Sequence, residues 1–146
     1  MMGEHHDTPS RIVAAARTCV GARFRVQGRD PAVGLDCVGL AAFAYRAAGA
    51  VLTLPSGYAL RGGDVRDMTD RLTANGFATV PDGLAIPGDL RVLRPGARQL
   101  HFAILGGTGF IHADLALRRI VERPGPPPWP VLGTWRWRPD ADRERR

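Results

Sequence analysis

The sequence predicts an α+β domain in which helices come first along the chain and an antiparallel sheet follows. Apolar residues recur at helical spacing in three segments before Gly76, whereas short apolar runs alternate with turn residues after it. Helices followed by a run of strands are typical of α+β proteins with an antiparallel sheet. The chain has 146 residues, of which 45% are hydrophobic, and this fits one domain with its own core.

The helical segments have recognisable ends. Ser10 is a candidate N-cap for the first helix, and Gly21 follows its last turn. The second helix is almost entirely apolar or small, which predicts a buried central helix that ends at Gly49. Residues 22–35 are rich in glycine and contain an Asp-Pro pair, so this segment is predicted to be a loop. The predicted helices cover residues 11–20, 36–48 and 64–74.

Six short segments in the second half are predicted strands. Residues 124–130 are rich in proline and are expected to form an extended, polyproline-like connection. The polar ends, residues 1–9 and 139–146, are predicted to be flexible tails, which leaves a single domain over residues 10–138. The predicted strands are 77–80, 89–93, 100–105, 109–113, 119–122 and 131–138.

The charge is unusual because all 20 basic residues are arginine, and the formal net charge is +6. A positive excess favours anionic partners. The arginines are scattered, and no reading helix or base-stacking platform is recognisable, which argues against a nucleic-acid-binding module. No apolar run is long enough for a membrane span, and the N-terminus lacks the apolar part of a secretion signal. We therefore expect a soluble protein made in the cytoplasm, without a membrane partner.

Cys37 is the most informative residue of the sequence. It follows Asp36 at the predicted start of the central helix, where free backbone amides and the helix dipole favour a thiolate. Gly34 and Gly39 would let a substrate backbone come close. Cys37 is thus either a nucleophile or a buried cysteine packed as a small hydrophobic residue. Cys19 lies on the apolar face of the first helix and is predicted to be a core residue.

A cysteine nucleophile needs a base, and the predicted strands carry two histidines. If these strands form a hairpin over the glycine-rich turn between them, Ala103 faces His112, and His101 faces Asp114. Side chains alternate along a strand, so His101, His112 and Asp114 share one face, with the histidines as diagonal neighbours. Either His112 or Asp114 could orient His101. The alternative is a pair of structural histidines on a sheet.

Several motifs together resemble the NlpC/P60 family of cell-wall cysteine peptidases, which have a papain-like fold. An Asp-Cys-x-Gly-Leu helix start is only moderately specific, but the order of the motifs along the chain is characteristic. The resemblance covers residues 12–113 and is to the short phage-tail or gene-transfer-particle branch of the family. The motifs lie in residues 15–31, 34–40, 87–90, 101–105 and 110–113.

The resemblance implies that Cys37 attacks the substrate, that His101 is the base and that His112 orients His101. Asp114 remains the rival orienting residue because strand pairing places it opposite His101. The family uses neither a metal ion nor an organic cofactor, so none is expected here.

Three further residues are candidates for substrate contact. The resemblance implies that Asp36 meets the amino end of the bound peptide. Phe24 stands where the family usually has a tyrosine whose hydroxyl helps to hold the site and the oxyanion, and phenylalanine cannot donate a hydrogen bond. Gln27 is a candidate to assist in that role. Val38 replaces a common serine after the nucleophile, which changes the expected substrate contacts.

The function implied by the resemblance is hydrolysis of an amide bond in the stem peptide of peptidoglycan, between D-glutamate and the diamino acid. Without a secretion signal, the enzyme needs another route to the periplasm or cell wall. Transport in a phage-like tail would supply it, with tail-tip or baseplate proteins as partners. The alternative is a structural tail component that keeps the fold without catalysis, for which Phe24 and Val38 are the best evidence.

Overall fold

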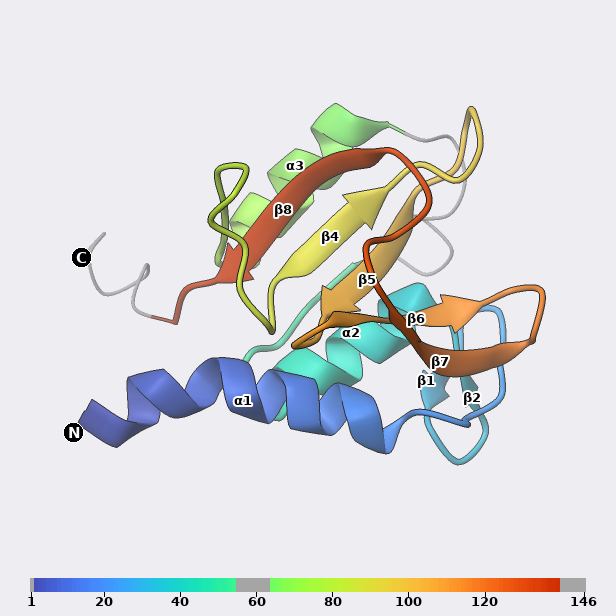
Figure 1. The fold of residues 1–146 in the computed structure, drawn as a ribbon, viewed down its shortest axis with the longest axis horizontal. Helices are drawn as coiled ribbons and strands as arrows, with labels where there is room; N and C mark the ends of the chain where they lie inside the picture. The colour runs from blue at the N-terminus through green and yellow to red at the C-terminus, as the bar shows by residue number, and fades with distance from the viewer. Residues whose placement is uncertain (1, 55–63, 140–146) are drawn as a thin grey trace.

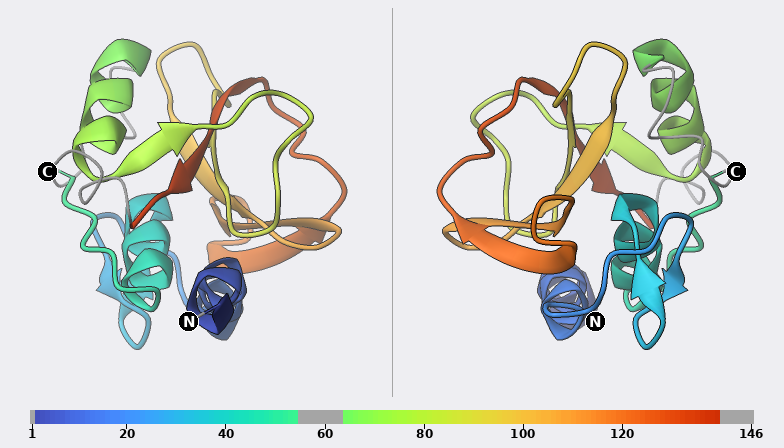
Figure 2. Two further views of the ribbon diagram at one scale, coloured as in Figure 1. Left: turned by 90° about the vertical axis from the view of Figure 1, so that its left-hand side faces the viewer. Right: turned by 90° about the vertical axis from the view of Figure 1, so that its right-hand side faces the viewer.

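The computed structural model describes residues 2–54 and 64–139, in which helices pack on a six-stranded antiparallel sheet (Figure 1). The strand order is β3-β8-β4-β5-β6-β7. The α1 and α2 helices lie side by side beneath β5 and β6, whereas α3 packs near β3 at the other end of the sheet (Figures 1 and 2). The predicted α+β class is confirmed. The helices are α1 (Met2–Thr18), α2 (Cys37–Arg46) and α3 (Val65–Ala74), and the sheet strands are β3 (Phe77–Thr79), β4 (Leu90–Leu93), β5 (His101–Leu105), β6 (Gly109–Asp114), β7 (Arg119–Pro124) and β8 (Val131–Trp137).

The start predicted for the first helix was wrong, because α1 begins at Met2 instead of after Ser10. Pro9 lies inside this helix and packs against Gly88, a contact between distant segments that local capping signals do not report. Residues 2–9, expected in the N-terminal tail, therefore extend the helix. Of the predicted C-terminal tail, residues 140–146 lie outside the described residues.

The segment 22–35, predicted to be a loop, contains a small hairpin of β1 (Arg29–Asp30) and β2 (Gly34–Leu35). Phe24 also forms an isolated bridge with Leu35, which ties the segment to the strand that precedes α2. The carbonyl group of Gly28 lies against Gly39 of α2, where no side chain would fit. Backbone pairing of this short hairpin needs no run of apolar residues, so the sequence carries little signal for it.

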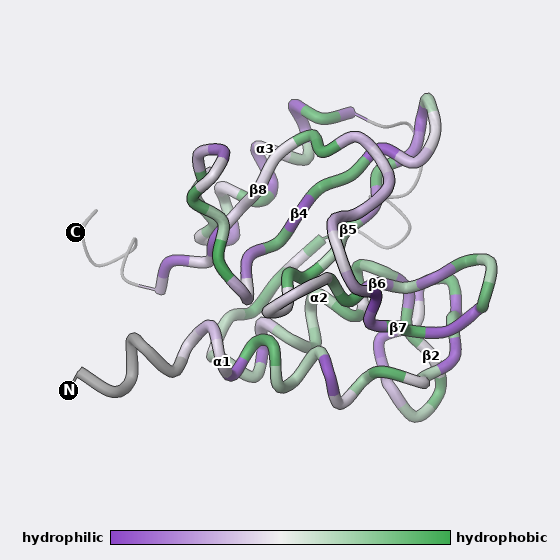
Figure 3. The backbone as a smooth tube through the Cα atoms, in the orientation of Figure 1, coloured by the Kyte–Doolittle hydropathy of each residue, from purple (hydrophilic) through white to green (hydrophobic). Residues whose placement is uncertain are grey.

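The central position predicted for the second helix is confirmed. Seven residues of α2, from Cys37 to Tyr45, are buried, and the helix is one of the most hydrophobic segments of the chain (Figure 3). Its small side chains allow close approach to α1 and to the sheet. The buried hydroxyl of Tyr45 donates a hydrogen bond of 2.8 Å to the carbonyl of Gly88. None of the described helices is long and apolar enough to cross a membrane.

The hairpin of β5 and β6 has the register predicted from its turn, with Ala103 opposite His112. The pairing ends there, so His101 and Asp114 lie just beyond the last paired residues. One face of the hairpin, including Phe102 and Ile111, joins the main core with α1 and α2. The opposite face carries the histidines and is covered in part by Trp129 from the proline-rich segment.

Candidate functional site

His101 and His112 are in direct contact. Nε2 of His101 lies 2.9 Å from Nδ1 of His112, and the two rings meet edge to face. The other nitrogen of His112, Nε2, lies 3.6 Å from Oδ2 of Asp114, which is beyond hydrogen-bond distance. This buried Nε2 atom has no hydrogen-bond partner in the described part of the chain. The three side chains therefore form a row in which Asp114 lies behind His112, and Nδ1 of His101 is left for another partner.

Both histidines are neutral near pH 7. Burial lowers the pKa of His101 far below its usual value, and the charge of His112 lowers it further, while Asp114 raises it. Burial also lowers the pKa of His112, against the opposing effect of Asp114, and the positive charge of Arg123 adds to the decrease. A neutral imidazole can accept a proton, so the pair is in the protonation state that a general base requires.

Cys37 opens α2 as expected, but its thiol is not ionised. The residue is 1% exposed, and burial raises the pKa of the thiol to about 12, with a further increase from the charge of Asp36. Hydrogen bonding from the backbone of Phe102 and of Val38 and the charge of Arg29 act in the opposite direction but do not compensate for burial. In this conformation, burial therefore opposes the thiolate that a position at a helix N-terminus is expected to favour.

The thiol lies near the start of β5, since the backbone of Phe102, which follows His101, lowers its pKa. Within the described residues, however, no hydrogen bond joins Cys37 to His101 or His112. In ligand-free enzymes, catalytic hydrogen bonds are often long and tighten only when substrate binds. The structure thus brings the predicted base and its neighbour together, whereas the described residues show no contact between the predicted nucleophile and either histidine.

Asp36 is fully buried and has a structural role in this conformation. Its carboxylate caps α2 by accepting a hydrogen bond of 2.8 Å from the amide of Gly39. It also accepts hydrogen bonds of 2.8 Å from the amide of Gln27 and from Nη1 of Arg29. A substrate amine could reach this carboxylate only if Arg29 moved away, so the predicted contact with substrate stays a prediction. Arg29 itself is held by Asp36 in a salt bridge of 2.8 Å.

Phe24 and the histidines line one cavity of about 420 Å³. Asp114 and the side chain of Trp129 also line it, whereas Cys37 does not. Gln27 is exposed and has a positive φ of 61°, and it is held to Asp36 through its backbone amide. The full lining is Phe24, Val26, Pro95, Gln99, Leu100, His101, His112, Ala113, Asp114, Leu115, Ala116, Arg123 and Trp129.

Trp129 and Arg123 are site residues that the sequence did not reveal. The ring of Trp129 lies 5.6 Å from that of His101 and 5.5 Å from that of His112, measured between centroids. Arg123 lies on β7 and lines the same cavity. The only available signal was a tryptophan among prolines next to predicted strands, and the tertiary position of such a segment cannot be inferred from its composition.

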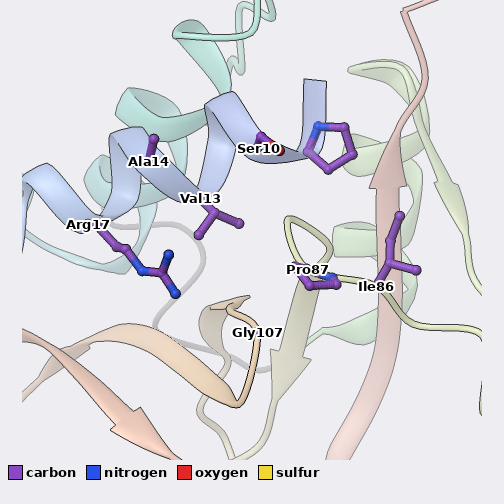
Figure 4. A pocket seen from close by; sticks show the side chains of 8 residues that line it. Ser10, Val13, Ala14, Arg17, Ile86, Pro87 and Gly107 are labelled. Carbon is purple, nitrogen blue, oxygen red and sulfur yellow. The ribbon is translucent and has the colours of Figure 1, made fainter. Parts of the chain in front are cut away.

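A second cavity, of about 390 Å³, lies between α1 and the segment before β4 (Figure 4). Neither a histidine nor a cysteine lines it, so it is separate from the histidine site. Within residues 2–54 and 64–139, no group of histidine, cysteine and acidic side chains is arranged to hold a metal ion. The second cavity is lined by Pro9, Ser10, Val13, Ala14, Arg17, Ile86, Pro87 and Gly107.

The packing of the α-helices on a six-stranded antiparallel sheet is similar to the fold of NlpC/P60 domains. The peptidoglycan hydrolase RipB from Mycobacterium tuberculosis is similar, with a TM-score of 0.65 and 21% identity over 93% of this chain and 67% of the RipB chain. The NlpC/P60 domain of the peptidoglycan hydrolase SagA gives a TM-score of 0.54, with 24% identity over 80% of this chain and 88% of that domain.

A third similar structure is the P60 domain of antigen MAP1204 from Mycobacterium avium subspecies paratuberculosis. Its TM-score is 0.61, with 19% identity over 90% of this chain and 95% of that domain. Neither a protein-family model nor a curated protein sequence matches the chain. The structural similarity confirms the fold implied by the sequence motifs, while activity has to be argued from the site itself.

Proposed function

We propose that this protein is a cysteine peptidase that hydrolyses an amide bond in the stem peptide of peptidoglycan. The observation that carries the proposal is the 2.9 Å contact between Nε2 of His101 and Nδ1 of His112, in a fold that is similar to that of peptidoglycan hydrolases and that places Cys37 at the start of its buried central helix. This contact sets the orientation of the His101 ring and leaves Nδ1 free for the thiol. A pair of merely structural histidines would not need to line a cavity of this size.

In the proposed reaction, Nδ1 of His101 accepts the proton of Cys37 as the sulfur attacks the carbonyl carbon of the amide. The tetrahedral intermediate collapses when His101 protonates the leaving amine, which forms a thioester on Cys37. A water molecule, activated by His101, then attacks the thioester and releases the acid and the free thiol. His112 acts as a positioning residue for His101, and Asp114 supports His112 from behind.

The resting site holds a neutral thiol and a neutral imidazole, so the proton must move after substrate binds. The transfer would accompany the attack of the sulfur on the substrate carbonyl, so that no free thiolate has to form in the buried site. Phe24 contributes an apolar wall and no hydrogen-bond donor to this cavity. The amide of Cys37 and the side chain of Gln27 are the candidates to stabilise the oxyanion.

The bond between D-glutamate and the diamino acid is the proposed scissile bond. We further propose that the protein is made in the cytoplasm, travels in a phage-like tail or gene-transfer particle, and acts in the periplasm or cell wall. Tail-tip or baseplate proteins would be its partners. The formal net charge of +6 suits a protein that works on an anionic cell wall.

The test is digestion of purified muropeptides by the wild-type chain, Cys37→Ser and Cys19→Ser, with products identified by mass spectrometry. The two cysteines are matched controls because both are free and 1% exposed. We expect product with the wild type and Cys19→Ser, and none with Cys37→Ser. Product formation by Cys37→Ser at the wild-type rate would contradict the proposed nucleophile.

The second candidate function is a structural tail component without catalysis. The absence of a hydrogen bond between Cys37 and the histidines of the described chain favours it, together with Phe24. The same digestion separates the two functions, because a structural component releases no product at any protein concentration.

A further inference from the structure

We propose that the histidine cavity contains a subsite for a substrate carboxylate, formed by Arg123 with Trp129 as its aromatic wall. The inference deepens the proposed function and rests on it, since it names the group of the stem peptide that this part of the cavity recognises. Nothing in the sequence motifs assigns a role to Arg123 or Trp129.

Strand pairing directs Arg123 toward the histidines. On β6 and β7, Phe110 is paired with Arg123, and the next pair on the same face is His112 with Val121. Arg123 therefore lies on the histidine face, one pair along from His112. Its guanidinium carbon is 5.6 Å from the ring centroid of Phe110 and 6.0 Å from that of Trp129, within the range of cation–π contact.

Arg123 has no counter-ion among the described side chains. Its neighbour on the strand, Glu122, forms a salt bridge with Arg17 at 3.1 Å. Asp114, the acidic residue of the cavity, lies against His112 instead. Arg123 is half-buried in a cavity with largely apolar walls, where a positive charge interacts strongly with an incoming anion. Other arginines of the described chain that do have carboxylate partners are Arg29, Arg71 and Arg136.

The aromatic contacts hold the guanidinium without satisfying its hydrogen bonds. Stacking on Trp129 and Phe110 restricts the side chain to one region of the cavity, while its N–H donors stay available. A planar guanidinium matches a carboxylate with two parallel hydrogen bonds, and a carboxamide cannot accept both. The chemistry therefore favours a carboxylate over its amide.

The proposed substrate carries such a group close to the reacting bond. An amide between glutamate and a diamino acid uses one of the two carboxyl groups of glutamate and leaves the other free. The diamino acid has a carboxyl group of its own on the other side of the scissile bond. Both groups present a carboxylate to Arg123. Amidating one of them at a time shows which one the subsite binds.

The experiment measures binding of three stem tripeptides by isothermal titration calorimetry, in the non-cleaving Cys37→Ala background. One peptide has free carboxylates, one is amidated at glutamate and one is amidated at the diamino acid. We expect one of the two amidations to weaken binding by about 10- to 100-fold, the range for a charge-assisted hydrogen bond. The amidation that weakens binding identifies the carboxylate that the subsite holds.

Arg123→Gln should abolish this preference, and Arg123→Lys should restore only part of it, since lysine keeps the charge without the planar fork. Arg66→Gln is the matched control. Arg66 is exposed on α3, so this substitution removes the same charge at a place away from the cavity. Equal binding of all three peptides, failure to bind any of them, or an unchanged preference in Arg123→Gln would overturn the subsite.

Hydrolysis by the wild-type chain is measured separately with the same peptides. A carboxylate preference in binding without any hydrolysis would overturn the proposed peptidase and leave the subsite supported. Hydrolysis at the same kcat/KM for all three peptides would support the proposed peptidase and overturn the subsite. Circular dichroism and a thermal melt of each variant show whether a lost preference reflects the missing group or a loss of folding.

Discussion

The ring of His112 separates His101 from Asp114, with Nδ1 of His112 at 2.9 Å from His101 and Nε2 at 3.6 Å from the carboxylate. Strand pairing in the sequence leaves both His112 and Asp114 as candidates to orient His101. The tertiary structure places His112 in contact with His101, whereas the pairing of β5 and β6 ends before His101 and Asp114 would meet. The ring of His101 contacts that of His112, whereas Asp114 affects the pKa of His101 through its charge.

The first prediction concerns this order of side chains. His112→Ala should lower kcat for stem-peptide hydrolysis by about 100-fold, because an unoriented base loses much of its catalytic contribution. Asp114→Asn should have a clearly smaller effect, since Asp114 does not touch His101. Steady-state kinetics with both variants test this, and a larger loss in Asp114→Asn than in His112→Ala would contradict the order. His112→Gln, which keeps a polar side chain, should recover part of the activity.

The second prediction concerns stability at acid pH. The pKa values of both histidines are lower in the folded protein than the usual value of about 6.5 in the unfolded chain. Below pH 6.5 the unfolded chain therefore binds more protons than the folded one, so the free energy of unfolding decreases as the pH falls. The stabilisation by the neutral pair is fully present above pH 6.5 and is lost as the pH falls toward the folded-state values.

Urea unfolding at pH 7.5 and pH 5.0 measures this decrease. The double variant His101→Gln, His112→Gln is the control, because it retains all the acidic groups and lacks only these two histidines. Its stability should change less between the two pH values. An equal change in the wild type and the double variant would show that the histidines do not contribute to the acid sensitivity.

The third prediction concerns the cysteines. Cys37 and Cys19 are each 1% exposed, and burial raises the pKa of both thiols. We therefore expect iodoacetamide to label both thiols slowly in the folded protein at neutral pH, although a helix N-terminus by itself favours a reactive thiolate at Cys37. Mass spectrometry of time points, with guanidinium-unfolded protein as the fully reactive reference, measures the rates. Fast labelling of Cys37 in the folded state would show that the thiol opens to solvent.

The fourth prediction concerns Asp36 as a structural residue. Asp36→Ala removes a fully buried carboxylate that caps α2 and holds Arg29 and Gln27, and should lower the free energy of unfolding by about 3 kcal/mol. Asp64→Ala is the matched control, because Asp64 caps α3 at the surface through one hydrogen bond, and its loss should cost about 1 kcal/mol. Equal losses in the two variants, measured by urea unfolding, would contradict a special role for Asp36.

The sequence by itself determined the α+β class, the central helix and the strands to within a few residues. Glycines and alternating apolar residues act locally, so their pattern predicts the turn between β5 and β6 and the pairing of Ala103 with His112. The helical start at Met2 and the short hairpin within residues 22–35 escaped prediction. Both depend on contacts between distant segments, such as that of Pro9 with Gly88.

Only the tertiary structure decided how far the thiol of Cys37 is buried and which residues line the histidine cavity. A helix N-terminus favours a thiolate, but the amount of solvent removed depends on every segment that packs around the sulfur, and here burial raises its pKa. Trp129 reaches the histidines because the chain folds back after β7 over the outer face of the sheet, whereas Arg123 reaches them through the pairing of β7 with β6. Local sequence patterns report backbone preferences, whereas burial and long-range contact arise when the whole chain has packed.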